Sequence, residues 1–204
     1  MARMIDCLII GAGQAGLAMS QCLTAGGIEH VVLERGRIGE RWRSERWPSL
    51  RLLTPGWMTR MPGGALAQKN DGFLASSDLV ERLETYAATH EVPLQDGTEV
   101  LAVEPMGDRF RIVTSSGTWI ARALVVATGA CDRPRIPAWS LGLDRRVHRI
   151  APSQYRGVDQ LPDGGVLIVG GSATGVQLAR EAAASGRRTV LAAGRHVRTP
   201  RRYR

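Results

Sequence analysis

The sequence has few cysteines and no long apolar run, and both absences narrow the function. Its three cysteines, Cys7, Cys22 and Cys131, lie far apart and form no CxxC motif. This argues against a disulfide scaffold, a zinc or other metal site and a dithiol redox centre. No apolar run approaches the roughly 20 residues that cross a bilayer. The residues after Met1 lead directly into an apolar, strand-like run, so we expect no signal peptide, no membrane partner and a cytoplasmic location.

Acidic residues are absent from the end of the chain. The net charge is +8, but residues 187–204 hold seven arginines and no acid, so the remainder is nearly neutral. This segment has one aromatic residue, Tyr203, and no nucleic-acid-binding motif, so we expect no nucleic-acid partner. With 204 residues, 44% of them hydrophobic, the chain has enough apolar side chains for one large or two small domains.

Two glycine-rich loops are the most informative positive feature. GAGQAG (11–16) follows the apolar run Met4–Ile10, which reads as a fully buried parallel strand, and opens a helical pattern over 13–25. GGSATG (170–175) follows the apolar run Val166–Val169 and opens a second helical pattern. In this setting the first glycine permits a tight turn, the second lets the backbone approach a pyrophosphate, and the third packs helix against strand. Both loops therefore predict dinucleotide sites.

An acidic residue follows the first loop at the spacing that such a site requires. Residues 28–33 predict a second strand, and Glu34 stands at its end. A carboxylate roughly 20 residues after the loop can accept hydrogen bonds from a ribose. Cys7 lies in the first strand and Cys22 in the first helix, so we expect both to be buried.

The rest of the chain predicts further alternating elements. Residues 35–73 are rich in Gly, Pro and Arg, and their tryptophans, Trp42, Trp47 and Trp57, argue against disorder. These tryptophans either close a small secondary core or belong to a loop that contacts a cofactor. The remaining predictions are a helix over 76–90, strands over 99–104, 110–114, 118–121 and 123–127, an extended Pro-rich connection over 132–139, and a strand, helix and strand over 166–169, 175–184 and 189–193.

The glycine loops occur with further motifs in a fixed order: Glu34, GERW (39–42), PSLRLLTP (48–55), ATG (127–129) and RPRIP (133–137). In this combination the sequence resembles flavoproteins with two dinucleotide-binding domains, most closely the flavin-containing monooxygenase-like group. The resemblance implies an α/β fold: a Rossmann-like FAD-binding domain of three-layer ββα type with a small antiparallel β-meander, then the start of a second, NAD(P)-binding Rossmann-like domain. It implies an FAD domain over 1–137, a connection over 138–163 and an incomplete NADPH domain over 164–204.

The resemblance also assigns residues to the two cofactors, FAD and NADPH. It implies that Glu34 binds the FAD ribose, that Thr54 lies near the isoalloxazine, and that the Val100 strand offers its backbone to adenine. The first loop, the flavin-side residues and the exit motif complete the implied FAD contacts: Gly11, Ala12, Gly13, Gln14, Ala15, Gly16, Arg35, Arg41, Trp42, Ala127, Thr128 and Gly129. The implied NADPH contacts are Gly170, Ser172, Ala173, Thr174 and Gly175.

Two positions depart from the family pattern. Ser172 replaces the middle glycine of the second loop, and its small hydroxyl can still donate to a phosphate. The group commonly carries a histidine shortly before an aromatic residue; that position here is Ala151, four residues before Tyr155. His148 stands three residues too early, and we expect an exposed loop histidine.

Charge chemistry indicates NADPH rather than NADH at the second site. Arg195 follows the predicted strand 189–193 where an acid would read a free ribose hydroxyl, and a guanidinium suits a 2′-phosphate.

The sequence leaves three functions open. The first is a flavin monooxygenase-like enzyme acting on a small-molecule substrate with molecular oxygen. The second is a flavin-dependent NAD(P)H reductase, although the missing CxxC disfavours the thioredoxin-reductase branch. The third is an inactive nucleotide-binding fragment, because the chain stops where the family's second domain continues. No catalytic residue can be identified, and a homodimer is left open.

Overall fold

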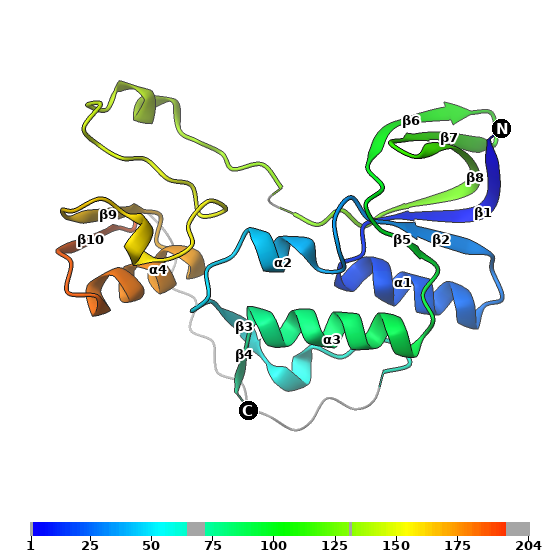
Figure 1. The fold of residues 1–204 in the computed structure, drawn as a ribbon, viewed down its shortest axis with the longest axis horizontal. Helices are drawn as coiled ribbons and strands as arrows, with labels where there is room; N and C mark the ends of the chain where they lie inside the picture. Colours follow the sequence, from blue (N-terminus) through cyan, green and yellow to red (C-terminus); the bar gives the residue numbers. More distant parts are fainter. Residues whose placement is uncertain (1, 65–71, 131, 195–204) are drawn as a thin grey trace.

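The computed structural model describes residues 2–64, 72–130 and 132–194, arranged as two units (Figure 1). The first contains β1 (Arg3–Ile10), α1 (Gln14–Ala25), β2 (His30–Leu33), α2 (Glu40–Ser44), β3 (Arg51–Pro55), η1 (Gly56–Met58), β4 (Phe73–Ala75), α3 (Ser76–Thr89), β5 (Leu94–Gln95), β6 (Val100–Met106), β7 (Arg109–Thr114) and β8 (Gly117–Val126). The connection holds η2 (Ala138–Gly142) and η3 (Val158–Gln160), and the second unit holds β9 (Val166–Val169), α4 (Ala173–Ala184) and β10 (Thr189–Ala192).

A six-stranded sheet organises the first unit, in the order β5-β2-β1-β8-β7-β6. β1 pairs in parallel with β2 on one side and with β8 on the other, which gives this apolar strand its central place. β8, β7 and β6 pair in antiparallel fashion and form the predicted meander. Because the carboxyl ends of β1 and β2 share one sheet edge, the first glycine loop and Glu34 meet there.

The prediction of two strands over 118–121 and 123–127 is wrong, because both belong to the single strand β8. Its ladder with β1 runs from the pair Arg3–Trp119 to the pair Ile10–Val126. Arg122 separates the two predicted strands, but its side chain is exposed and its Nη1 lies 3.4 Å from Asp6 Oδ1 on the neighbouring strand. A charged side chain on a solvated stretch of sheet does not interrupt the ladder.

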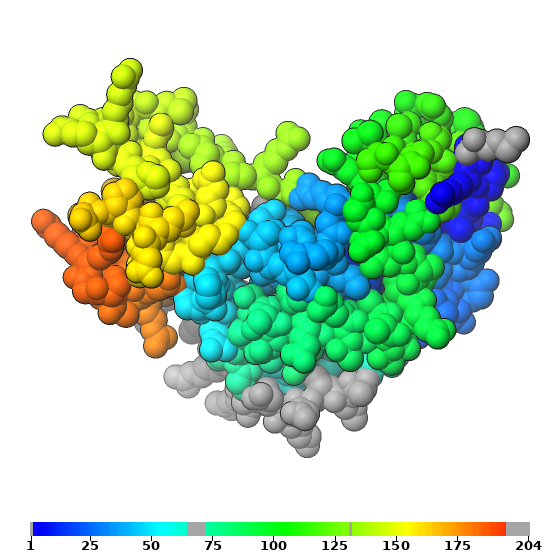
Figure 2. Space-filling view, viewed as in Figure 1, coloured from blue at the N-terminus to red at the C-terminus, as the bar shows by residue number. Residues whose placement is uncertain are grey.

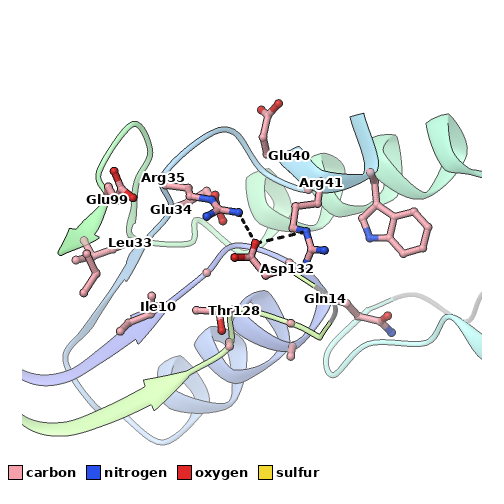
Figure 3. A pocket seen from close by; sticks show the side chains of 18 of the residues that line it. Ile10, Gln14, Leu33, Glu34, Arg35, Glu40, Arg41, Glu99, Thr128 and Asp132 are labelled. Carbon is pink, nitrogen blue, oxygen red and sulfur yellow. Dashed lines mark hydrogen bonds and ion pairs between the residues drawn. The ribbon is translucent and has the colours of Figure 1, made fainter. Parts of the chain in front are cut away.

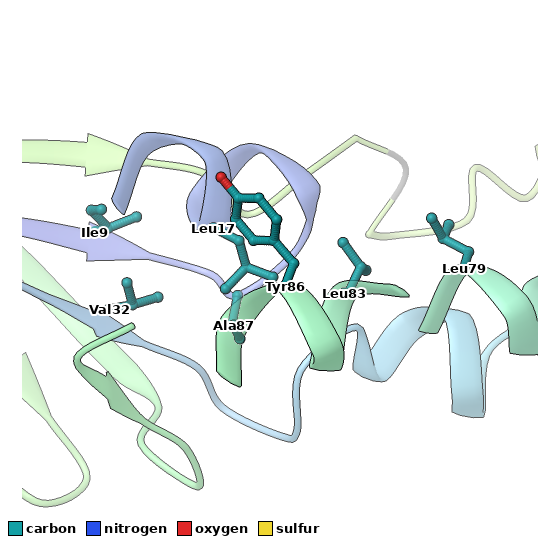
Figure 4. Close-up of a cluster of buried hydrophobic side chains, with 8 residues drawn as sticks. Ile9, Leu17, Val32, Leu79, Leu83, Tyr86 and Ala87 are labelled. Carbon is teal, nitrogen blue, oxygen red and sulfur yellow. The ribbon is translucent and has the colours of Figure 1, made fainter. Parts of the chain in front are cut away.

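Both faces of the sheet are covered, which produces the predicted three layers. The adjacent residues Leu8 and Ile9 point to opposite faces and are both fully buried. On the Ile9 face, α1 and α3 contribute Leu17 and Leu83 to one core (Figure 4). On the Leu8 face, the meander contributes Ile112 and others to a second core. The predicted α/β fold is confirmed.

Two burial predictions are wrong. Met4 is 58% exposed, so β1 is buried only toward its carboxyl end and not over its whole length. Cys22 is exposed because the buried side of α1 carries Gly16, Leu17 and Ser20, and Cys22 lies on the other side of the helix. Cys7 is buried as predicted, and this burial raises the pKa of its thiol.

The second unit repeats the start of the first. β9 and β10 pair in parallel, and α4 connects them, as α1 connects β1 and β2. This βαβ arrangement confirms the predicted start of a second Rossmann-like unit. Among the described residues, no helix is both long and apolar enough to span a bilayer.

Candidate functional site

The three glycines of the first loop have three different surroundings. Gly11 has φ +108°, and a Cβ there would lie 2.6 Å from the Ala127 carbonyl oxygen. A Cβ on Gly16 would lie 1.8 Å from the Gly11 carbonyl oxygen, so only glycine lets α1 pack this closely. A Cβ on Gly13 would meet no atom within 4 Å. The fold therefore requires the outer two glycines, whereas the space beside the middle one is open for a ligand.

The amino end of α1 is a ready site for an anion. Gly13 is its N-cap, and no side chain of the described residues caps the helix. The first N–H groups of a helix have no partner within it, and the helix dipole adds partial positive charge there. Gln14 and Ala15, in the first turn, line the cavity described below. A phosphate suits this position.

Glu34 is held against the glycine loop by two backbone donors. Its Oε2 accepts from the N–H of Ala12 at 2.8 Å, and its Oε1 accepts from the N–H of Gly36 at 3.0 Å. Each carboxylate oxygen keeps further lone pairs for a ligand hydroxyl. The carboxylate is therefore oriented before any ligand arrives.

A cavity of about 500 Å³ opens above the loop, at the carboxyl edge of the sheet. Its volume falls in the range of small-molecule and cofactor pockets. Most predicted FAD residues line it: Gly11, Gly13, Gln14, Ala15, Glu34, Arg35, Arg41, Trp42, Val100, Ala127, Thr128 and Gly129. Several of these side chains surround the opening in Figure 3. Ala12, Gly16 and Thr54 are not among the lining residues.

Other lining residues were not predicted: Ile10, Leu33, Gly39, Glu40, Arg46, Thr98, Glu99, Ala130 and Asp132. Ile10 and Leu33 directly precede predicted site residues and could have been found as the ends of the two strands. Asp132 is the first acid after the ATG motif, which is a weaker signal.

Asp132 joins two predicted arginines at the cavity (Figure 3). Its Oδ1 lies 2.7 Å from Arg35 Nη2 and 3.9 Å from Arg41 Nε. The hydrogen bond from Arg35 lowers the pKa of Asp132, and the same bond raises the pKa of Arg35. Arg41 also donates to Glu45 at 2.9 Å and to the Ala130 carbonyl at 2.9 Å. Asp132 thus brings two guanidinium groups together at the cavity.

The tryptophans divide between the two predicted alternatives. Trp42 lines the cavity, as the cofactor-loop alternative expects. Trp47 is buried in a small cluster with Leu50 and Tyr155, as the secondary-core alternative expects, and Trp42 also packs against this cluster. The secondary-core alternative thus holds for Trp47, and contact between Trp42 and a cofactor stays a prediction.

The second glycine loop copies the first in its backbone but does not line this cavity. Gly170 has φ +118°, and a Cβ on Gly175 would lie 1.8 Å from the Gly170 carbonyl oxygen. Ser172 has φ −79°, close to the −87° of Gly13, so a side chain fits at the middle position without backbone strain. Ser172, Ala173 and Thr174 lie at the start of α4. Arg195 lies outside the described residues.

The connection between the units carries no histidine at the family position. His148 is exposed, as predicted, whereas Ala151 and Tyr155 are buried. Within the described residues, no cluster of three or more His, Cys, Asp or Glu side chains could hold a metal ion.

Comparison with known proteins identifies the family. The family model described as pyridine nucleotide-disulphide oxidoreductase matches residues 8–203. The chain belongs to this family. It is 37% identical over 182 residues to the uncharacterized oxidoreductase CzcO-like of Geobacillus kaustophilus, covering 89% of this chain and 52% of that relative. The chain thus spans about half the length of the curated relatives it matches.

Solved structures similar to this chain include a flavin monooxygenase and a disulfide reductase. A variant of the flavin monooxygenase from Stenotrophomonas maltophilia has a TM-score of 0.77 and 26% identity, over 93% of this chain and 57% of that one. The bacillithiol disulfide reductase Bdr (YpdA) from Bacillus cereus also has a TM-score of 0.77, at 22% identity, over 93% of this chain and 58% of that one. Because the identity to the reductase is only 22%, this similarity is evidence for a shared fold alone.

Proposed function

We propose that the chain binds FAD at the first loop and acts within an NADPH-using flavin monooxygenase-like oxidoreductase. The observation that carries the proposal is the combination of Gly13, open to the cavity, with Glu34, already oriented against the loop. The family membership and the flavin monooxygenase neighbour support a flavin-dependent oxidoreductase class. We further propose the division into 1–137, 138–163 and 164–204.

The residues of the first unit fit FAD. The N–H groups at the start of α1 would bind the pyrophosphate, and Gly13 leaves room for it beside the backbone. Glu34 would accept from the ribose hydroxyls, and the backbone of Val100 would pair with adenine. Arg41 and Trp42 would lie toward the flavin, and Thr54 is assigned to the flavin end. Bound FAD would supply the hydride-accepting and oxygen-reacting chemistry.

The second loop is assigned to NADPH. Gly175 reproduces the close packing of Gly16, and Gly170 has a positive φ like that of Gly11. Ser172 offers a hydroxyl donor where the first loop has Gly13. Arg195 is proposed to pair with the 2′-phosphate. Replacing it by aspartate (Arg195→Asp) should shift the preference from NADPH to NADH, measured as the ratio of flavin reduction rates. An unchanged ratio would contradict the assignment.

The function is tested on the purified full chain by its visible spectrum. Bound flavin should be yellow and should bleach when NADPH is added without air. With air and a nucleophilic substrate, oxygenated product distinguishes a monooxygenase from a reductase. A chain that stays colourless after loading with FAD contradicts both enzyme proposals and favours the nucleotide-binding fragment.

A reductase is the second candidate, and one observation favours it. Ala151 occupies the position where the monooxygenase group commonly has a histidine, and it is 5% exposed. A methyl group there can neither donate nor accept a hydrogen bond. Hydrogen peroxide in place of oxygenated product would support this reading. The organic substrate, molecular oxygen as co-substrate, the cytoplasmic location and a homodimer stay predictions.

A further inference from the structure

One side of α4 holds the second unit against the first through its side chains. Gln177 and Glu181 are four residues apart, so they lie on the same side of the helix. The Gln177 amide pairs with the main chain of Arg51: Nε2 donates to the carbonyl at 2.9 Å and Oε1 accepts from the N–H at 3.1 Å. Arg51 begins β3 in the first unit. A side chain of the second unit thus recognises backbone of the first.

Glu181 accepts two hydroxyl groups from different parts of the chain. The Tyr155 hydroxyl, from the connection, donates to Oε1 at 2.9 Å, and the Ser49 hydroxyl, from the first unit, donates to Oε2. Burial raises the pKa of Tyr155, and the Glu181 carboxylate adds to the effect. Tyr155 therefore remains a hydrogen-bond donor throughout the physiological pH range. The carboxylate joins three segments at one point.

An apolar cluster backs these polar contacts. Tyr155 packs edge-on against Trp47, with ring centroids 6.2 Å apart and an interplanar angle of 67°. Leu178 of α4 packs against the same cluster, and both rings are almost fully buried. In Figure 2 the yellow connection lies against the blue and cyan residues of the first unit, at the floor of a concave surface between the two lobes. The contact has an apolar centre and hydrogen bonds around it.

The position of this contact connects the two glycine loops. α4 begins at the second loop, so the orientation of the helix sets the orientation of the loop. The 47–51 segment follows α2, which carries Arg41 and Trp42 of the first cavity. We propose that Glu181 is a positioning residue: through Tyr155 and Ser49 it holds the second loop in one orientation relative to the first cavity.

This inference rests on the proposed binding of a dinucleotide at each loop. Hydride transfer needs the reacting atoms about 3–3.5 Å apart, and a misplacement of about 1 Å can cost about 10²-fold in rate. Loss of the Glu181 contacts should therefore slow transfer between the sites without emptying the first site.

The first test measures the orientation itself, in the full chain without added ligand. Spin labels are placed on the exposed native Cys22 and on a cysteine introduced by Ala184→Cys, with Cys131→Ser to avoid a third label. Pulsed electron paramagnetic resonance should give a narrow distribution of distances between the two labels in this background. The control Glu29→Gln, which neutralises an exposed acid elsewhere, should give the same narrow distribution. Tyr155→Phe and Glu181→Ala should broaden the distribution. An equally narrow distribution in both variants would overturn the proposal.

The second test measures flavin content and flavin reduction by NADPH. Glu181→Ala should keep the FAD stoichiometry of the parent and lower the reduction rate about tenfold or more. Glu181→Gln, which keeps one acceptor oxygen, should recover part of that rate. An unchanged rate in Glu181→Ala would overturn the proposal. A parent chain that binds no FAD would contradict the proposed function instead. In that case the distance measurement alone tests whether Glu181 holds the two units in one orientation. Ser49→Ala replaces Glu181→Ala in both tests if the latter fails to fold.

Discussion

Gly13→Ala should separate ligand binding from folding at the first loop. Gly13 has φ −87° and ψ −171°, a conformation that alanine adopts without strain. The added Cβ would meet no protein atom within 4 Å. It would instead fill the space on the cavity side, where we place the pyrophosphate. The variant should therefore fold normally and bind flavin poorly.

The expected magnitudes follow from this geometry. Alanine is a poorer N-cap than glycine, which destabilises the folded state by up to about 1 kcal/mol. Alanine also restricts the unfolded chain, which stabilises the folded state by about 0.4–1 kcal/mol. The net change in the free energy of unfolding should thus stay within about 1 kcal/mol. Losing one hydrogen bond to a charged phosphate costs about 1.5–3 kcal/mol, which weakens FAD binding about 10- to 150-fold.

Gly16→Ala provides the matched contrast three residues later. Its Cβ would lie 1.8 Å from the Gly11 carbonyl oxygen, so α1 or the loop would have to move by about 1 Å. Overpacking of this severity should cost about 3 kcal/mol of stability. Gly175→Ala makes the same 1.8 Å contact in the second loop and should leave flavin binding by the first loop nearly unchanged.

The assay is a flavin titration followed by urea unfolding of each variant, monitored by circular dichroism. Gly13→Ala should bind flavin weakly and have near-normal stability, whereas Gly16→Ala should have low stability. If Gly13→Ala binds FAD as tightly as the parent, the open space beside Gly13 is not where the pyrophosphate lies. If Gly16→Ala is as stable as the parent, close packing against the Gly11 carbonyl oxygen is not what requires glycine at position 16.

Three further predictions concern side chains around the site. Glu34→Gln should weaken FAD binding about tenfold in the same titration, because a neutral amide accepts ribose hydroxyls less strongly than a carboxylate; unchanged affinity would remove Glu34 from the ribose. Ser20→Ala should cost about 1–3 kcal/mol in urea unfolding, because the Ser20 hydroxyl lies 2.7 Å from the Nε2 of buried His30, and the exposed Ser77→Ala should cost almost nothing. Hydrogen bonds from Arg37 lower the pKa of Glu40 to about 2. The carboxylate therefore stabilises the fold above its unfolded pKa of about 4.3, and the stability difference between the parent and Glu40→Gln should shrink as the pH falls toward 2; a constant difference would contradict this.

The sequence predicted the elements whose patterns are local. One βαβ unit contains the run Leu8–Ile10, the glycines of the first loop and Glu34. Their positions follow from short-range geometry. The break within β8 was wrongly predicted because Arg122 interrupts the apolar pattern, whereas the ladder depends on β1, more than a hundred residues away. Which side of α1 faces the sheet also depends on distant packing, and this is why the burial of Cys22 was missed.

The cavity required the same long-range information. The site residues that were predicted from motifs line the cavity where the motif itself forms the cavity wall. This is the case for the first glycine loop and for the ATG motif. Asp132 faces Arg35 and Arg41 only because β8 brings the exit segment back beside β2 and α2. Thr54 belongs to β3, which pairs in antiparallel fashion with β4, and it is not among the residues that line this cavity. No spacing rule along the chain could supply either result.

Comparison of the two loops shows which glycines of the motif are required by the fold and which position is not. The outer glycines are demanded by the fold in both loops, since a Cβ on Gly16 or on Gly175 would overlap a carbonyl oxygen of its own loop. The middle position is not demanded by the backbone in either loop, because Gly13 and Ser172 share nearly the same conformation. Any requirement for glycine there must come from the ligand. Ser172 is therefore compatible with an intact second loop, and it predicts a phosphate held partly by a hydroxyl and less by close approach to the backbone.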